Sequence, residues 1–184
     1  LMDVERHASR LTRLVNQLLS EAMVMHRAEA RHLEAFDLVD VVKRAVRDAV
    51  PVSDDVQVGF ISSVAKAPMR GDAVLLGEAI KNLIDNAVKR GMPEPSGLDA
   101  EVDIALHPAD GGYRLTVSDR GPGIAAEDRD RIVQRFERGD TRSSGAGLGM
   151  AIVSRVVASH GGGIELIDRE GGGLTVCLTL GGVP

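Results

Sequence analysis

The chain is poor in aromatic residues and in cysteine, and it carries no excess of positive charge. Its 184 residues include three Phe, one Tyr, no Trp and a single Cys, and the formal net charge is −5. So few rings cannot form a base-stacking platform, and the acidic balance argues against general nucleic-acid binding. One Cys excludes a disulfide framework within the chain and a Cys-based zinc cluster, which fits a reducing compartment.

Long apolar segments are also missing. No apolar run approaches the roughly 20 residues that are needed to cross a bilayer. Residues 1–10 carry charges throughout, unlike a signal peptide. We therefore expect no membrane contact by this chain itself. Because residue 1 is Leu rather than Met, we expect the sequence to be a piece of a longer protein.

The first segment, residues 1–34, contains no Gly or Pro and predicts one long helix. Its apolar residues recur in alternating steps of four and three, which is the heptad seam of a helical bundle. The seam residues are Val4, Ala8, Leu11, Val15, Leu18, Ala22 and Met25. So narrow a seam indicates a partner helix from a preceding segment or from another chain. The alternative is a helix that packs back on its own domain. We divide the chain into a bundle arm, 1–35, and a domain, 36–184.

The rest of the chain predicts a mixed fold. Helices are expected over 38–49, 73–90 and 147–159, with a short amphipathic piece near 127–136. Strands are expected over 56–60, 102–106, 113–117, 164–168 and 174–180. Asp37 and Asp72 are expected to cap the first two helices, and glycine-rich turns at 110–112 and 171–173 predict two hairpins. Helices and antiparallel hairpins that share one core indicate an α+β fold, a two-layer α/β sandwich.

Polar residues interrupt the helix expected over 73–90. Asn82, Asn86 and Lys89 stand at i, i+4 and i+7 and so share one helix face. Amide oxygens can bind a hard cation, and an ammonium group can neutralise phosphate. A solvated polar stripe is the alternative interpretation.

An acidic residue and two glycines follow the strand expected over 113–117. A carboxylate such as Asp119 at a strand end can accept a hydrogen bond from an exocyclic amine. Gly121 and Gly123 let the backbone approach a flat ligand closely. On its own, this Asp-x-Gly-x-Gly pattern also occurs in ordinary turns.

A third motif places Gly145, Gly147 and Gly149 before an apolar helix, where backbone N–H groups can bind an anion. Its spacing matches neither the dinucleotide-binding glycine pattern nor a phosphate-binding Gly-Lys-Ser/Thr loop. Between the second and third motifs lies Phe136-x-Arg138, followed by a Ser- and Gly-rich stretch. This segment suits a lid over a bound phosphate, or else a solvated loop.

The order and spacing of these four motifs resemble the ATP-binding catalytic domain of bacterial two-component sensor histidine kinases. That domain has the Bergerat-type fold, which is shared with gyrase, Hsp90-type and MutL-type ATPases. The resemblance covers residues 36–184. The Phe136-x-Arg138 motif and the preceding helix favour the kinase branch, and residues 1–35 resemble the second arm of its dimerisation hairpin.

The resemblance implies an ATP site and a role for each motif residue. It implies that Asn86 holds Mg²⁺ with help from Asn82, that Lys89 reaches the phosphates, and that Asp119 accepts from the adenine amino group. The other implied site residues are Gly121, Gly123 and Ile124 at the purine, Phe136 and Arg138 at the lid, and Gly145, Gly147, Leu148 and Gly149 around the triphosphate. Arg90 replaces a frequent aromatic beside adenine, and Thr175 lies one position beyond the family's Thr.

The family's activity is that of an ATP-dependent protein-histidine kinase, which passes the phosphoryl group from ATP to a His and then to an Asp of a response regulator. The resemblance further implies a homodimer and the cytoplasmic portion of an inner-membrane sensor. None of the five histidines is followed by the acidic, apolar and basic residues and the Pro of the family's acceptor. They are His7, His26, His32, His107 and His160, and we predict that all lie on the surface.

The chain is therefore expected to bind ATP without phosphorylating itself, and no catalytic residue is assigned. Two alternatives stay open. In the first, ATP gates contacts of the first helix and no phosphate moves. In the second, the chain is an ATPase of the wider superfamily, which would need an acidic residue where Asn82 stands.

Overall fold

The computed structural model describes residues 32–49, 56–90, 100–137 and 147–181. The predicted bundle helix lies almost entirely outside these ranges. Its last predicted residue, Glu34, instead begins the strand β1 (Glu34–Asp37), two residues before the predicted start of the domain. None of the helices within the described ranges is long and apolar enough to cross a membrane.

The five-stranded sheet has the order β2-β4-β5-β7-β6. The strands are β2 (Val56–Ser62), β4 (Ala100–Ala109), β5 (Gly112–Ser118), β6 (Gly163–Asp168) and β7 (Leu174–Gly181). Both predicted hairpins are confirmed, because β4 pairs antiparallel with β5 and β6 pairs antiparallel with β7. The sequence did not predict that β2 lies parallel to β4. Such a pair needs a long crossover, which a helix and the strand β3 provide here.

A second, two-stranded sheet joins β1 to β3 (Pro68–Gly71) in antiparallel register. Neither strand was predicted, because four residues are too few to show a clear alternation of apolar and polar positions.

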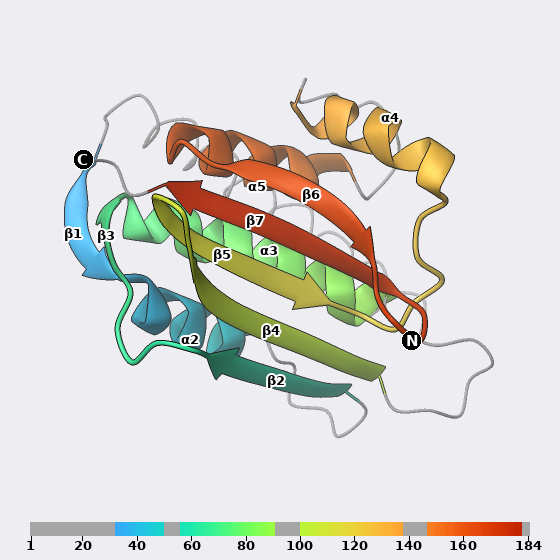
Figure 1. Cartoon of the computed structure of the whole chain (residues 1–184), viewed down its shortest axis with the longest axis horizontal. Helices are drawn as coiled ribbons and strands as arrows, with labels where there is room; N and C mark the ends of the chain where they lie inside the picture. Colours follow the sequence, from blue (N-terminus) through green and yellow to red (C-terminus); the bar gives the residue numbers. More distant parts are fainter. Residues whose placement is uncertain (1–31, 50–55, 91–99, 138–146, 182–184) are drawn as a thin grey trace, which may run out of the picture.

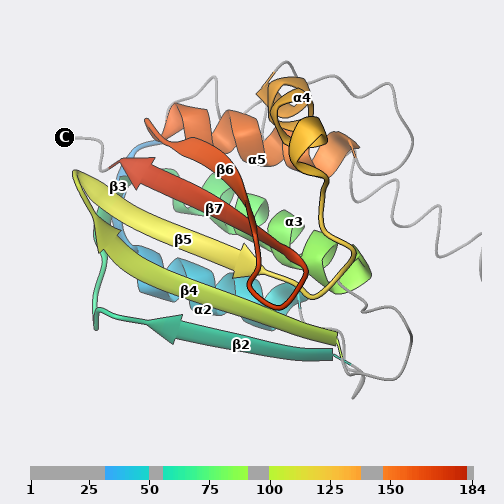
Figure 2. The same cartoon turned by 45° about the vertical axis from the view of Figure 1, so that its right-hand side comes forward.

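The helices form the second layer of the sandwich. Figures 1 and 2 show α2 (Leu38–Ala49), α3 (Ala73–Arg90) and α5 (Gly147–Ser159) against one face of the five-stranded sheet. The helix α4 (Ala126–Glu137) packs beside α5. The expected two-layer α/β sandwich is therefore confirmed. We call the face of the sheet that points away from these helices the outer face.

Both predicted helix caps form. The Oδ1 atom of Asp37 accepts hydrogen bonds from the backbone N–H groups of Val39 and Ala67, at 2.9 and 3.0 Å. The Oδ1 atom of Asp72 accepts from Val74 and Leu75, each at 3.0 Å. A capping carboxylate satisfies N–H groups that have no partner within their own helix, which is worth about 1 kcal/mol.

The core lies between the two layers and is almost wholly aliphatic. Its largest fully buried side chains include Leu76, Ile80 and Ile84 of α3 and the strand residues Ile104, Leu106, Leu115 and Leu178. Burying a Leu or Ile side chain contributes roughly 1.5–3 kcal/mol, so the interlocking of α3 with the sheet is a main source of stability.

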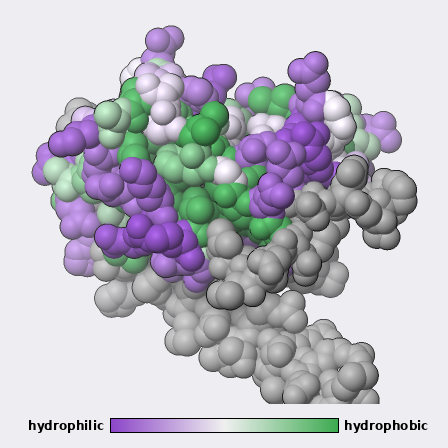
Figure 3. Space-filling model, turned by 90° about the horizontal axis from the view of Figure 1, so that it is seen from below, coloured by the Kyte–Doolittle hydropathy of each residue, from purple (hydrophilic) through white to green (hydrophobic). Residues whose placement is uncertain are grey.

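The edge of the sheet at β2 is less well covered than its centre. Val56, Val58 and Phe60 pack against the core but are only partly buried, and Ile61 on the outer face is exposed. Viewed from the side where β2 and α2 lie, the surface shows hydrophobic residues between hydrophilic ones (Figure 3).

One end of the sandwich gathers several segments that are distant in the sequence. The C-terminal half of α3, the end of β5, the turn between β6 and β7 and the start of α5 all lie at this end (Figures 1 and 2). These are the segments that carry three of the four motifs.

Candidate functional site

Asp119 is a buried carboxylate immediately after β5. Asp119 is only 8% exposed. Its backbone N–H donates to the carbonyl of Leu174 at 2.8 Å, and its Oδ1 accepts from the N–H of Gly121 at 2.8 Å. Burial raises the pKa of Asp119, while backbone hydrogen bonding to its carboxylate from Gly121 and Leu174 and the positive charge of Arg169 act to lower it. The carboxylate is thus fixed in direction and largely removed from water, which suits discrimination of a ligand amine.

Glycines line the backbone next to Asp119. Gly173 has a φ of 110°, and a Cβ at this position would lie 1.9 Å from the carbonyl oxygen of Asp119. Gly123 has a φ of 71°, and its Cβ would lie 3.2 Å from the carbonyl oxygen of Gly173. Only glycine allows both the left-handed backbone and so close an approach of two chain segments. The β6–β7 turn and the loop after β5 therefore form one packed unit.

The two asparagines of α3 face the start of α5. A Cβ on Gly149 would lie 3.2 Å from Oδ1 of Asn82 and 3.8 Å from Nδ2 of Asn86. The amide nitrogen of Asn82 donates to the carbonyl of Glu78 at 2.9 Å. Glycine at position 149 thus keeps open a small space beside two half-buried amides, at the N-terminal end of a helix.

This space is compatible with a magnesium ion that is bound mainly by phosphate oxygens and waters. Amide oxygens are suitable donors for a hard cation, and Mg²⁺ usually takes only one or two protein ligands together with phosphate oxygens and waters. In the described parts of the chain, no group of three or more His, Cys, Asp or Glu residues could hold a metal ion.

Two predicted site residues contact other side chains instead. Lys89 is exposed, and its Nζ lies 3.4 Å from Oδ2 of Asp85 one turn earlier. The hydroxyl of Thr175 lies 2.8 Å from that of Ser118. Its neighbour Leu174 packs against the core. Since side chains alternate along a strand, Thr175 points to the outer face, away from the helices.

Ile124 packs partly against the core, and its carbonyl accepts hydrogen bonds from Nε and Nη2 of Arg129 at 3.1 and 3.0 Å. Arg129 also pairs with Asp168 at the end of β6. The loop after β5 is therefore connected to α4 and to β6.

The predicted lid falls largely outside the described residues. Arg138 and Gly145 lie outside them, as do the side chains of Arg90, Phe136 and Leu148. Their roles stay predictions.

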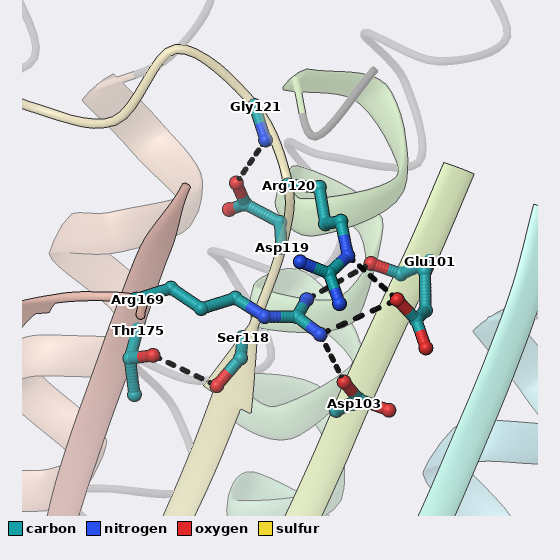
Figure 4. Close-up of polar contacts among 8 residues, drawn as sticks. All are labelled: Glu101, Asp103, Ser118, Asp119, Arg120, Gly121, Arg169 and Thr175. Atoms are coloured by element: carbon teal, nitrogen blue, oxygen red, sulfur yellow. Dashed lines mark hydrogen bonds and ion pairs between the residues drawn. The ribbon is translucent and has the colours of Figure 1, made fainter. Parts of the chain in front are cut away.

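The sequence did not predict a cluster of four charged residues beside Asp119 (Figure 4). Nε of Arg120 donates to Oε2 of Glu101 at 2.7 Å, and Arg169 pairs with both Glu101 and Asp103. The hydrogen bond from Arg120 lowers the pKa of Glu101. No motif or spacing marks these residues, because they come together only through strand pairing. The sequence predicts the glycine triplet 171–173 only as a turn, although three successive glycines are also compatible with a close backbone approach.

The prediction that all five histidines lie on the surface is wrong for His160, which is 2% exposed. Its Nε2 accepts from the backbone N–H of Asp72 at 3.0 Å, and its Nδ1 lies 2.7 Å from the carbonyl of Val156. It therefore joins the end of α5 to the start of α3, and Figure 1 shows these two helix ends at the end of the sandwich opposite to the end of β5. Of the others, His32 and His107 are exposed as predicted, and His7 and His26 lie outside the described residues.

Comparison with known proteins identifies the family of the chain. Residues 71–182 match the family model described as "Histidine kinase-, DNA gyrase B-, and HSP90-like ATPase". Among curated proteins, the sensor-like histidine kinase SenX3 of Mycolicibacterium smegmatis is 35% identical over 97% of this chain and 46% of its own length. The signal transduction histidine-protein kinase/phosphatase MprB of the same species is 36% identical over 76% of this chain and 28% of its own length. The chain thus spans less than half of either relative.

Solved structures give the same result. The mycobacterial sensor histidine kinase MprB has a TM-score of 0.66 and 30% identity, covering 82% of this chain and 98% of that one. Full-length ShkA in complex with AMPPNP has a TM-score of 0.71 and 28% identity, covering 92% of this chain and 35% of that one. With its two-layer sandwich, its buried Asp119 and its Asn-bearing helix, the chain belongs to the histidine kinase-, DNA gyrase B- and HSP90-like ATPase family and is a homologue of the sensor histidine kinases.

Proposed function

We propose that this chain binds Mg-ATP and transfers its γ-phosphoryl group to a His imidazole on a helical hairpin. In that step the bond between the γ-phosphorus and the bridging oxygen breaks, a phosphorus–nitrogen bond forms, and ADP leaves. The observation that carries the proposal is the buried Asp119 carboxylate, held beside glycine backbone at the same end of the sandwich as Asn82, Asn86 and Gly149.

At the purine end, Asp119 accepts a hydrogen bond from the adenine amino group, and Gly121, Gly123 and Ile124 shape the surrounding pocket. A hydrogen bond to a charged acceptor contributes about 1.5–3 kcal/mol. A purine that presents a carbonyl oxygen in place of the amine would face the carboxylate with no donor. This arrangement favours adenine over guanine.

At the phosphate end, Asn86 and Asn82 offer amide oxygens to Mg²⁺, which when bound neutralises charge on the phosphates. The N–H groups at the start of α5, including those of Gly147 and Gly149, point toward the same anion. The lid residues Phe136, Arg138 and Gly145 complete this end of the site in the proposal. Catalysis then consists mainly of positioning and charge neutralisation.

The phosphate acceptor belongs to another segment in this proposal. No histidine of the chain is followed by the residues that mark the family's acceptor. The chain is therefore expected to bind ATP without labelling itself. In the longer protein, a homodimer formed by the hairpin would bring the acceptor to the site, and a response regulator would take the phosphate onto an Asp. The whole assembly would form the cytoplasmic part of a membrane-anchored sensor.

Two measurements on the full 184-residue chain test the proposal. Calorimetric titration with Mg-ATP should show binding, and adding a separately made sensor-kinase hairpin with an acceptor His should yield an acid-labile phosphorylated hairpin from γ-labelled ATP. Absence of ATP binding would refute the proposal. Binding without transfer would favour a nucleotide-gated interaction module, and release of free phosphate without transfer would favour an ATPase.

A pair of glycine variants locates the phosphate end of the site. Gly149→Ala places a methyl group 3.2 Å from Oδ1 of Asn82, so we expect weaker Mg-ATP binding. Gly77→Ala on α3 is the matched control, because its Cβ makes an ordinary contact of 3.8 Å with Val41. In both helices, alanine is a better helix former than glycine by about 1 kcal/mol. Equal ATP affinity in both variants would exclude the assigned phosphate end.

A further inference from the structure

Arg169 spans the outer face of the sheet from one hairpin to the strand β4. It follows the last residue of β6, and its guanidinium reaches Glu101 and Asp103. The sheet order places β7 and β5 between β6 and β4, and Figure 4 shows the side chain passing over the end of β5 to reach Glu101 and Asp103. Its side chain is 11% exposed, and it is the least exposed member of the four-residue cluster.

The guanidinium makes several contacts with β4. Nη2 donates to Oδ2 of Asp103 and lies 3.4 Å from Oε2 of Glu101, and Nη1 donates to the backbone carbonyl of Glu101 at 3.5 Å. A planar guanidinium with several fixed donors suits such multiple attachment better than a lysine does. Oε2 of Glu101 also accepts from Nε of Arg120, the residue directly after Asp119. The cluster therefore connects β4 both to the β6–β7 turn and to the segment that carries Asp119.

The backbone of Arg169 continues this connection toward Asp119. Its N–H donates to the carbonyl of Gly173 at 3.3 Å, and its carbonyl accepts from Gly172 at 3.0 Å. Gly173 in turn lies directly against the carbonyl of Asp119, and the Asp119 N–H donates to the carbonyl of Leu174. The turn that contacts the Asp119 backbone is thus attached to β4 through Arg169.

We propose that Arg169 is a positioning residue for Asp119, holding the β6–β7 turn against the Asp119 backbone through its attachment to Glu101 and Asp103. This inference rests on the proposed role of Asp119 in binding adenine nucleotide. The charge of Arg169 supports it, since that charge acts to lower the pKa of Asp119 against the effect of burial. Arg169 itself does not contact the nucleotide in this proposal.

A double-mutant cycle tests the proposal by calorimetric measurement of ATP affinity. The chains compared are wild type, Arg169→Gln, Asp119→Asn and the double variant. Arg169→Gln should weaken ATP binding roughly 3- to 10-fold in the wild-type background, and have little further effect when Asp119 is already Asn. Arg169→Lys, which keeps the charge, should recover part of the affinity. Thermal unfolding of each variant checks that it is folded.

Arg131→Gln is the matched control. Arg131 forms an exposed ion pair with Asp128 on α4, and its replacement should leave ATP affinity unchanged. If Arg169→Gln does not fold, Asp103→Asn at a half-exposed position removes the other end of the span, and the same cycle is measured with it.

The outcomes separate this inference from the proposed function. No ATP binding by the wild type would refute the proposed function. ATP binding that Asp119→Asn weakens but Arg169→Gln leaves unchanged would overturn only the positioning role. Equal losses from Arg169→Gln in both Asp119 backgrounds would also overturn it, because Arg169 would then act independently of the carboxylate.

Discussion

Replacing Asp119 by Asn separates the contribution of this carboxylate to ligand binding from its contribution to the fold. The amide keeps an oxygen that can still accept the hydrogen bond from the N–H of Gly121, which is 2.8 Å long in the wild type. It removes the negative charge and directs an NH₂ group or a neutral oxygen at the adenine amine. We expect ATP affinity to fall by about 1.5–3 kcal/mol, which is roughly a 10- to 150-fold rise in Kd.

The same change should not destabilise the protein without ligand. Burial raises the pKa of Asp119, so the folded state holds its proton more tightly than the unfolded state does. A group with a raised folded-state pKa makes folding less favourable as pH rises from the unfolded pKa through the folded one. At neutral pH the ionised carboxylate therefore costs stability, and a neutral Asn avoids that cost. We expect the Tm of Asp119→Asn to equal or exceed that of the wild type, with a difference that shrinks on acidification.

Calorimetry at neutral pH and thermal unfolding over a pH series measure the two effects. Asp110→Asn is the control, because Asp110 is exposed in the turn between β4 and β5 at the other end of the sheet. It should change neither ATP affinity nor Tm appreciably. An unchanged Kd for Asp119→Asn would refute the pocket assignment. A clearly lower Tm would show that the carboxylate holds the loop together, and would refute the reasoning from burial.

The contacts of Asp119, Gly173 and His160 give three more predictions. The ATP affinity of the wild type should fall as the pH drops through the raised pKa of Asp119, whereas the affinity of Asp119→Asn should not. Calorimetric titrations in a buffer series measure this difference, and the variant corrects for the ionisation of ATP itself. Gly173→Ala should lower both Tm and ATP affinity more than Gly172→Ala, because both have positive φ (110° and 99°) but only a Cβ at 173 meets the Asp119 backbone; equal effects would mean that backbone conformation alone matters. His160→Phe removes the ring hydrogen bonds to the backbone of Asp72 and Val156 and should lower the free energy of unfolding in urea by roughly 1–3 kcal/mol, whereas the exposed His107→Phe should change it by less than about 0.5 kcal/mol.

Features that depend on neighbours in the sequence were predictable. The caps at Asp37 and Asp72, the helices α2, α3 and α5 and the two hairpins all have local signals, since capping, periodicity and turn glycines act within a few residues. Asp119 could be selected because an acidic residue ended an apolar strand just before two glycines.

Features that depend on tertiary contacts were not predictable. His160 follows an apolar helix and precedes three glycines, a context that looks like an exposed helix end, yet its ring packs where a Cβ on Gly71 would lie 2.4 Å from Cδ2. Arg169 and Glu101 are far apart in sequence and meet only through the order of strands in the sheet. The parallel placement of β2 had no local signal either.

The two ends of the sandwich differ in how their polar groups affect stability. At one end, His160 joins α5 to α3 and the cap of Asp72 closes the start of α3, so polar groups are satisfied by the protein itself. At the other end, a carboxylate is buried against its ionisation preference and the turn at 171–173 takes positive φ throughout, both of which lower stability. Because an amine donor stabilises the ionised form of Asp119, ATP binding would offset the cost that its burial imposes. The helices α3 and α5 are therefore joined at the end away from Asp119. The end with unfavourable groups is the one that a bound ligand would stabilise.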